Sequence, residues 1–261
     1  MRLRPARRRP SPPDWASPAF TAADIPDAVW ERRSELRGIA FDLDAQAALL
    51  AELAPLGAEL ANTGYPFANR FYEHVDAEVA YAMVRRLRPA RVVELGSGFS
   101  TRALRAALAA NGSGTHEGYD PYTTTDGVQA VSAQDVPEDV FSALVQDDIL
   151  FVDTTHVVKT GGDVNRIVLD VLPALAAGVV IHFHDIWLPF EYHRALTETL
   201  GANWSEQYLL QALLSGNPGF EVLLGNAALA RDRREAVQAA FPEWDPAGEY
   251  PSAFWLRRTA A

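Results

Sequence analysis

The sequence predicts an α/β protein built on a doubly wound, mostly parallel sheet. From residue 91 onward, short apolar runs alternate with stretches whose apolar residues recur at helical spacing. This alternation is typical of β-α-β units, in which helices cover both faces of a parallel sheet. The run at 91–95 ends in a turn containing Gly96 and Gly98. Glycines there would let the backbone approach a ligand closely, as expected where a first strand leads into a helix.

The N-terminal part is predicted to be a basic arm followed by helices. The first nine residues contain five arginines, and residues 1–20 lack the apolar core of a secretory signal, so we expect a disordered arm. Residues 21–88 are expected to form a helical cap, because leucines 49, 53, 56 and 60 recur at helical spacing. The same spacing is found in Val75, Val79, Met83 and Leu87, and Pro89 would end that helix.

The remaining residues, 89–261, are expected to form one α/β domain. Its predicted strands are 91–95, 116–120, 128–132, 149–153, 178–185, 220–225 and 252–258. Its predicted helices are 100–112, 138–144, one of about 163–175 with Asp163 as its cap, and 205–216. The last helix lies in a long insertion, about 186–217, which we expect to cover the substrate as a lid.

Composition and charge restrict the partners that we expect. The chain has no cysteine, which fits a reducing compartment and leads us to expect a cytoplasmic location. Its net charge of −11 argues against a nucleic-acid partner, since phosphate backbones would be repelled. The longest apolar stretch, 172–181, is too short to cross a membrane. The oligomeric state is not readable from the sequence.

Acidic residues end the first two predicted strands. Glu94 precedes the glycine turn, and Asp120 ends the second strand. A dinucleotide fingerprint would need a third glycine where Thr101 stands, and a phosphate-binding loop would need a Gly-Lys pair that is absent. A carboxylate at a strand end suits a ligand with ammonium or hydroxyl groups, and Asp120 is placed to accept hydrogen bonds from a ribose.

This combination resembles the class I S-adenosylmethionine-dependent methyltransferases. The matching stretches are VVELGSGFST (92–101), YDP (119–121) and SAQDVP (132–137). The resemblance implies a Rossmann-like sheet of seven strands with an antiparallel terminal strand, and S-adenosylmethionine as cofactor. The residues that it implies for the cofactor are Glu94, Gly96, Ser97 and Gly98 at the amino-acid end, Asp120 at the ribose, and Gln134 with Asp135 beside the adenine.

Polar side chains also follow the fourth and fifth predicted strands. Because parallel strands end at one edge of a sheet, Asp153, His156, His184 and Asp185 are expected near the glycine turn. The layout resembles that of the catechol and caffeoyl-CoA type O-methyltransferases, which have an Asp, a Lys three residues on, and an Asp-Asn pair at these positions and bind magnesium. Here His156 stands at the Lys position and His184–Asp185 at the pair.

These differences leave two chemistries open. Asp153, His184 and Asp185 are candidate ligands of a divalent metal, and an imidazole ligand favours zinc, manganese, iron or nickel over magnesium. Without a metal, His156 or His184 is the candidate catalytic base that takes a proton from a hydroxyl group. His182 lies deeper in its strand and is expected to satisfy buried hydrogen bonds.

Aromatic residues of the insertion are predicted to wall a pocket for a small-molecule acceptor. Trp187 and Tyr192, with the acid Glu191 between two aromatic residues, are the candidate substrate contacts. Asn203 and Glu206 have the spacing of a capping box, so Glu206 is expected to be structural.

We therefore expect an S-adenosylmethionine-dependent enzyme that methylates a hydroxyl group of a small molecule. Two alternatives stay open. One is a metal-dependent oxygenase on the same scaffold, since Asp153, His156 and His184 are the ligand types of non-haem iron sites. The other is a non-catalytic protein that binds the cofactor.

Overall fold

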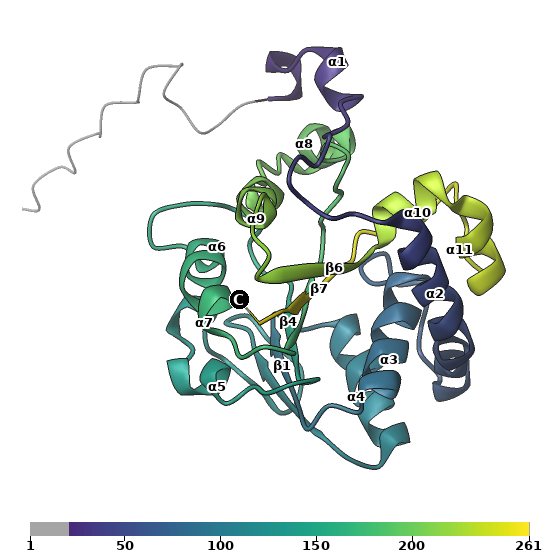
Figure 1. Ribbon diagram of the computed structural model, residues 1–261, viewed down its shortest axis with the longest axis vertical. Coiled ribbons are helices and arrows are strands. Elements are labelled where there is room, and N and C mark those ends of the chain that lie inside the picture. The colour runs from purple at the N-terminus through teal and green to yellow at the C-terminus, as the bar shows by residue number, and fades with distance from the viewer. Residues whose placement is uncertain (1–20, 261) are drawn as a thin grey trace, which may run out of the picture.

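A central sheet of seven strands with helices on both faces forms the computed structural model, which describes residues 21–260 (Figure 1). The predicted arm at 1–20 lies outside the described residues. The strands are β1 (Arg91–Leu95), β2 (Thr115–Tyr119), β3 (Val128–Gln129), β4 (Ile149–Val152), β5 (Val180–Phe183), β6 (Phe220–Gly225) and β7 (Phe254–Arg258).

The strand order is β3-β2-β1-β4-β5-β7-β6. Strands β1 to β5 pair in parallel, whereas β7 is antiparallel to both of its neighbours, β5 and β6. The predicted doubly wound, mostly parallel sheet with an antiparallel terminal strand is thus confirmed. The order reverses between β1 and β4, and in open α/β sheets ligands bind outside the carboxyl ends of strands at that point.

Two groups of helices cover the sheet, one on each face (Figure 1). On one face lie α2 (Leu43–Gly57), α3 (Asp76–Leu87) and α4 (Phe99–Asn111); on the other lie α5 (Glu138–Ser142), α6 (Asp163–Arg166), α7 (Leu172–Ala174) and α9 (Glu206–Leu214). The remaining α-helices are α1 (Asp27–Trp30), α8 (Arg194–Leu200), α10 (Asn226–Asp232) and α11 (Arg234–Ala240). A π-helix, Ile167–Val171, joins α6 to α7, and short 3-10 helices lie at Ala22–Asp24, Ala58–Thr63 and Ala133–Asp135. None of the helices in residues 21–260 combines the length and apolar character needed to cross a membrane.

The alternation of side chains along β1 explains how the two cores form. Val92 belongs to the core on the α3–α4 side, whereas Val93 and Leu95 belong to the core on the opposite side. Successive side chains of a strand point to opposite faces, so Glu94 shares the face of Val92. The carboxylate of Glu94 therefore lies under the first turn of α4 rather than along the edge of the sheet.

Helix α3 forms part of the layer that covers the sheet. Its residues 76–84 are all buried, and they share one core with strand residues such as Phe151. Helix α2 packs on α3 from outside. The expected boundary between the helical cap (21–88) and the α/β domain (89–261) stays a prediction. In the structure, the helices on either side of it, α3 and α4, belong to the same layer.

The segment after β4 differs from the prediction in one detail. Gly162, not Asp163, precedes the first turn of α6 and occupies the capping position. The carboxylate of Asp163 instead accepts hydrogen bonds from the backbone N–H and the hydroxyl of Thr155, at 3.0 and 2.7 Å. It folds back on the preceding loop because that loop offers two donors close by.

Candidate active site

The glycine turn after β1 touches the loop after β4. Gly96 has a φ of +98°, and a Cβ atom there would lie 2.0 Å from the backbone oxygen of Asp153. Only glycine fits such a position. A Cβ atom on Gly98 would meet no protein atom within 4 Å. One glycine of the turn therefore allows two loops to pack, and the other leaves space beside the start of α4.

Two of the predicted cofactor residues are in direct contact. The Ser97 hydroxyl donates to the Asp120 carboxylate at 2.6 Å and lies 3.0 Å from the Thr123 hydroxyl. The other Asp120 oxygen accepts from the backbone N–H of Tyr122 at 2.8 Å. The carboxylate of Asp120 is therefore held at the edge of the sheet beside the glycine turn, and it is only partly buried.

Glu94 is fully buried, and its carboxylate has three protein partners. The hydroxyls of Ser100 and Thr101 donate to its two oxygens at 2.7 Å, and His116 Nε2 approaches at 2.7 Å. These contacts fix the start of α4 relative to β1 and β2. A direct contact between Glu94 and a cofactor stays a prediction.

The predicted adenine-side loop is tied to α6 by one arginine. The guanidinium of Arg166 donates to the backbone oxygens of Gln134 and Val136, the latter at 2.6 Å. The side chains of Gln134 and Asp135 are exposed. The structure brings neither into contact with Asp120, and their role beside an adenine stays a prediction.

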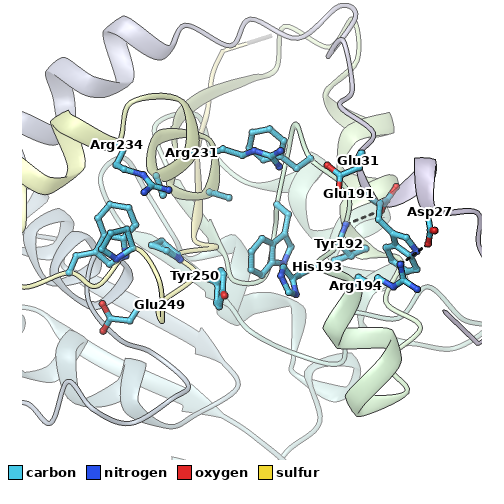
Figure 2. Close-up of a pocket in the computed structure, with 18 of the residues that line it drawn as sticks. Asp27, Glu31, Glu191, Tyr192, His193, Arg194, Arg231, Arg234, Glu249 and Tyr250 are labelled. Carbon is cyan, nitrogen blue, oxygen red and sulfur yellow. Dashed lines mark hydrogen bonds and ion pairs between the residues drawn. The ribbon is translucent and has the colours of Figure 1, made fainter.

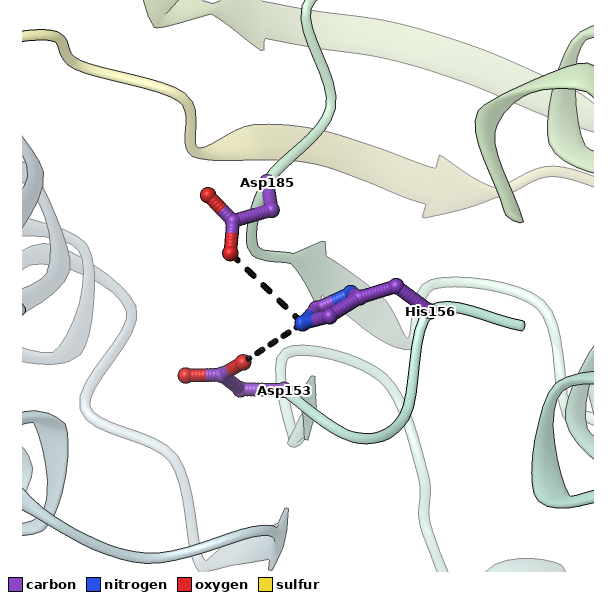
Figure 3. A group of neighbouring side chains, drawn as sticks. All are labelled: Asp153, His156 and Asp185. Atoms are coloured by element: carbon purple, nitrogen blue, oxygen red, sulfur yellow. Dashed lines mark ion pairs between the residues drawn. The ribbon is translucent and has the colours of Figure 1, made fainter. Parts of the chain in front are cut away.

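The four polar residues after β4 and β5 converge. Nε2 of His156 lies 3.4 Å from Asp153 Oδ1 and 3.5 Å from Asp185 Oδ2 (Figure 3). Nδ1 of His184 lies 3.6 Å from an oxygen of each of the same two carboxylates. We call Asp153, His156, His184 and Asp185 the rim cluster. It joins the predicted metal ligands Asp153, His184 and Asp185 with His156, which was predicted as a base and, in the oxygenase alternative, as an iron ligand.

The two histidines of the rim cluster each have a further carboxylate on the other ring nitrogen. Glu206 Oε2 lies 2.9 Å from His156 Nδ1, and Asp76 Oδ2 lies 3.4 Å from His184 Nε2. The capping-box prediction for Glu206 is wrong, because Ser205 caps α9 and the Glu206 side chain turns inward to His156. Asp76 was missed, since at the start of α3 it reads as an ordinary helix-start acid.

In the rim cluster, neighbouring charges shift each pKa in the direction opposite to burial. They raise the pKa values of the two histidines and lower that of Asp185. Burial alone would lower the pKa of His156, but contacts with Asp153 and Glu206 and the charge of Asp185 outweigh it and raise the pKa to about 10. The pKa of His184 is raised well above its ordinary value, since the carboxylates of Asp185 and Asp153 likewise outweigh burial. Burial would raise the pKa of Asp185, but His184 and His156 lower it.

Backbone conformation sets the rim cluster apart from ordinary loops. His156 and Asp185 both have a φ of +57°, although neither is glycine. Non-glycine residues in the left-handed region are strained and cluster at functional sites. The carbonyl of His156 accepts hydrogen bonds from the N–H groups of Ser205 and Glu206, at 2.8 and 3.1 Å, which hold this conformation.

His182 lies directly below the cluster and is fully buried, but it satisfies the expected buried hydrogen bonds only in part. Its ring stacks on Phe151 with a centroid distance of 3.7 Å. Its Nε2 lies 3.4 Å from the hydroxyl of Tyr72, whereas its Nδ1 has no hydrogen-bond partner within residues 21–260. Burial and the neighbouring His184 lower its pKa well below the ordinary value, so the ring is neutral.

A cavity of about 580 Å³, which we call the rim cavity, opens onto His184 and Asp185. Its walls also include Asp76, Trp187 and the exposed ring of Phe71. Of the three predicted substrate contacts, Trp187 lines this cavity. A small molecule that entered it would meet the rim cluster from the side of Asp185.

Glu191 and Tyr192 line a second cavity, of about 600 Å³, which we call the lid cavity (Figure 2). Glu191 accepts a hydrogen bond from the hydroxyl of Tyr208, and the hydroxyl of Tyr192 accepts one from the backbone N–H of Gln207 at 2.9 Å. The two cavities share a wall formed by Trp187, His193, Glu249, Tyr250 and Pro251. All three predicted substrate contacts thus line the lid cavity, and Trp187 also borders the rim cavity.

Comparison with known proteins was made on both sequence and structure. Residues 93–186 match the profile of a protein family described as a methyltransferase domain. No curated protein matches the chain. Among solved structures, the SAH-bound methyltransferase PaMTH1 of Podospora anserina has 19% identity and a TM-score of 0.40, over 91% of this chain and 95% of its own. A chain from Thermobifida fusca YX, provisionally named a methyltransferase, has 16% identity and a TM-score of 0.40, over 90% of this chain and 98% of its own.

Proposed function

We propose that this chain, which carries a class I S-adenosylmethionine-dependent methyltransferase domain, transfers the methyl group to a hydroxyl oxygen of a small-molecule acceptor. The observation that carries the proposal is the rim cluster beside the glycine turn, where Gly96 touches Asp153. Cofactor and acceptor would then meet at one edge of the sheet, with the acceptor in the rim cavity.

The residues around the glycine turn would hold and orient the cofactor. S-adenosylmethionine supplies a methyl group that is already activated on a sulfonium sulfur. The protein therefore has mainly to align a nucleophile and exclude water. Asp120, held by Ser97, offers a carboxylate to ribose hydroxyls. The open space at Gly98 permits close approach of the amino-acid end.

The donor set of the rim cluster fits a divalent metal ion. An ion at ~2.0–2.2 Å from each donor keeps neighbouring donors roughly 3.0–3.6 Å apart. The nitrogen–oxygen distances of 3.4–3.6 Å in the rim cluster agree with that spacing. A bound ion would supply a positive charge that lowers the pKa of an acceptor hydroxyl. Asp153, His156 and Asp185 would hold it, since their donor atoms all lie within 4.8 Å of one another, and His184 lies beside them.

Without an ion, His156 or His184 would accept the proton of the acceptor hydroxyl. Either imidazole would have to be neutral to accept it. The neighbouring carboxylates raise the pKa of both histidines and so oppose the neutral form. This supports the metal-assisted version over metal-free base catalysis.

Cofactor binding is tested first, by calorimetry with S-adenosylmethionine and S-adenosylhomocysteine. Asp120→Ala should abolish or strongly weaken binding of both compounds. Asp126→Ala, in the loop that follows, is the matched control and should bind as the unchanged chain does. If neither compound binds the unchanged chain, the proposal fails at its first step.

Methyl transfer is tested next, with labelled S-adenosylmethionine and parallel panels of small phenols, alcohols, amines and thiols. We expect label on the oxygen acceptors, and its loss when a chelator is present. Transfer to amines alone would contradict the assignment to oxygen.

An oxygenase is the second candidate, because the structure brings two histidines and two carboxylates together. It predicts oxygen consumption by the Fe²⁺-loaded chain and no methyl transfer. The two candidates therefore give opposite results in the same pair of assays.

A further inference from the structure

We propose that Glu206 and Asp76 are positioning residues that orient the two histidines and make the rim cluster a site for a divalent transition-metal ion rather than magnesium. The inference rests on the metal-assisted version of the proposed function, but it concerns which ion binds and what holds its ligands. It can be tested with metal ions alone.

The contact between Glu206 and His156 fixes the direction in which His156 offers a ring nitrogen. Glu206 Oε2 lies 2.9 Å from Nδ1, so the Nδ1–H group donates to it and Nε2 faces Asp153 and Asp185. The Glu206 side chain is only 1% exposed, and its second oxygen has no hydrogen-bond partner within residues 21–260. Its one polar contact is therefore with the histidine.

His184 has a similar arrangement, but the two ring nitrogens exchange their roles. Asp76 Oδ2 lies 3.4 Å from Nε2 of His184, which leaves Nδ1 facing the oxygens of Asp153 and Asp185. Asp76 is fixed in turn by the side chain of Asn226, at 2.8 Å. The two histidines, in the loops after β4 and β5, thus each have a buried carboxylate beside the nitrogen that points away from the cluster.

The inward-facing nitrogens lie between the two carboxylates of the cluster. Each is 3.4–3.6 Å from an oxygen of Asp153 and of Asp185, which is the separation expected of two donors on one ion. The side chains of His156 and His184 are only 7% and 9% exposed. Two nitrogens of largely buried side chains are thus aimed between two carboxylates, an arrangement of donors that suits a divalent ion.

The chemistry of the donors decides the class of ion. Magnesium prefers oxygen donors and keeps several waters, whereas imidazole nitrogen suits zinc, manganese, iron and nickel. A metal-binding histidine almost always donates its other N–H to a carboxylate or carbonyl, which fixes the tautomer and raises the basicity of the ligand. Glu206 and Asp76 supply this contact to His156 and His184.

Ion binding is measured by calorimetry on the full chain, stripped with a chelator and titrated with ZnCl₂, MnCl₂ or MgCl₂. The visible absorption of bound Co²⁺ reports the ligand geometry. We expect one Zn²⁺ or Mn²⁺ per chain and much weaker Mg²⁺. Glu206→Gln should weaken transition-metal binding by about 10–100-fold and change the Co²⁺ spectrum.

Three variants separate positioning from a merely structural role. Glu206→Ala should bind more weakly than Glu206→Gln, since the glutamine oxygen can still accept from His156. Glu198→Gln, an exposed acid of the same lid on α8, is the matched control and should bind as the unchanged chain does. Asp76→Asn should weaken binding in the same direction. Thermal unfolding of every variant in chelator shows whether its fold is intact.

Several results would overturn the inference. Failure of the unchanged chain to bind a transition-metal ion would do so, as would Mg²⁺ binding as tight as Zn²⁺. Unchanged affinity and Co²⁺ spectrum in folded Glu206→Gln would remove the positioning role. A chain that binds the ion but transfers no methyl group refutes the proposed function and leaves this inference standing. Methyl transfer by a chain that binds no ion refutes this inference and leaves methyl transfer, the proposed function, standing.

Discussion

At the scale of single residues, the two glycines of the turn after β1 have different roles. Gly96 packs its backbone against the oxygen of Asp153, whereas Gly98 faces open space. The first is needed for the fold itself, and we expect the second to matter only when a ligand is present.

This difference predicts opposite behaviour of two alanine variants. Gly96→Ala should lower the free energy of unfolding by about 2–4 kcal/mol, because it combines a φ of +98° with a clash against backbone. Gly98→Ala should keep its stability within about 1 kcal/mol but lose affinity for S-adenosylhomocysteine. Thermal melts with and without that compound measure both effects. Equal stability losses in the two variants would contradict the assignment.

Asp163 gives a prediction about pH. Burial alone would raise its pKa, but the hydrogen bonds from Thr155 outweigh burial and lower it below the ordinary value of 3.8. A lowered pKa in the folded chain means that the contribution is present above about pH 4 and is lost as pH falls through the folded pKa. Asp163→Asn should therefore cost about 1–3 kcal/mol at neutral pH, and less as the pH falls.

Melting temperatures of the unchanged chain and Asp163→Asn, compared from roughly pH 3 to 7, test this dependence. Asp170→Asn is the control, since that carboxylate is exposed on the same stretch of helix. A difference that stays constant over the whole range would show that the charge of Asp163 does not matter.

The sequence did not predict the roles of Glu206 and Asp76, because their partners lie far away in the sequence. Glu206 was assigned to a cap because Asn203 is near it, yet its partner His156 is 50 positions upstream. Asp76 gave no signal at all, because an acid in the first turn of a helix is common and stabilising in its own right. By contrast, Asp153 and Asp185 could be placed, since strand ends of a parallel sheet share one edge.

At the scale of elements, the predicted lid, 186–217, is joined to the rim cluster through its backbone. The start of α9 donates two hydrogen bonds to the carbonyl of His156, and the N–H of Val158 donates to the Ser205 hydroxyl at 2.8 Å. A ligand that fixes His156 should therefore also fix α9.

Hydrogen exchange tests this coupling. Adding Zn²⁺ to the chelator-treated chain should slow amide exchange in residues 205–214, because local opening of α9 would have to break the contacts with a fixed His156. Exchange in α4, on the other face of the sheet, is the internal reference and should not change. Uniform slowing across both helices, or none, would contradict a specific link.

Strands were the elements that the sequence predicted best. The runs at 91–95 and 220–225 coincide with β1 and β6, because each is a short apolar stretch between turn residues. The third strand was expected to span 128–132 but is only two residues long, Val128–Gln129. An edge strand has one neighbour, so apolar pattern alone does not fix its length.

At the scale of the whole molecule, β7 completes both the sheet and the site. It lies between β5 and β6, and its Trp255 is fully buried, with its ring 4.7 Å from that of His182. The hydroxyl of Ser252, two residues before β7 begins, donates to Asp185 at 3.1 Å. Loss of packing at β7 should therefore affect the rim cluster as well as stability.

Trp255→Ala should lower the free energy of unfolding by about 3–5 kcal/mol, because it leaves a large cavity in the core. Trp255→Phe, which keeps a ring, should cost clearly less. Urea unfolding of both variants gives the two values, provided that the slope with denaturant is unchanged. Similar losses of unfolding free energy in the two variants would show that the cavity does not cause the destabilisation.

The contact between Gly96 and Asp153 has a consequence for how relatives of this protein can diverge. Because the two loops touch through backbone atoms, neither can be lengthened or shifted alone without moving the glycine turn away from the rim cluster. Insertions can accumulate instead in the segment 186–217, which borders both cavities from outside the sheet. We therefore expect homologous enzymes with new acceptors to differ in that segment while these two loops keep their lengths.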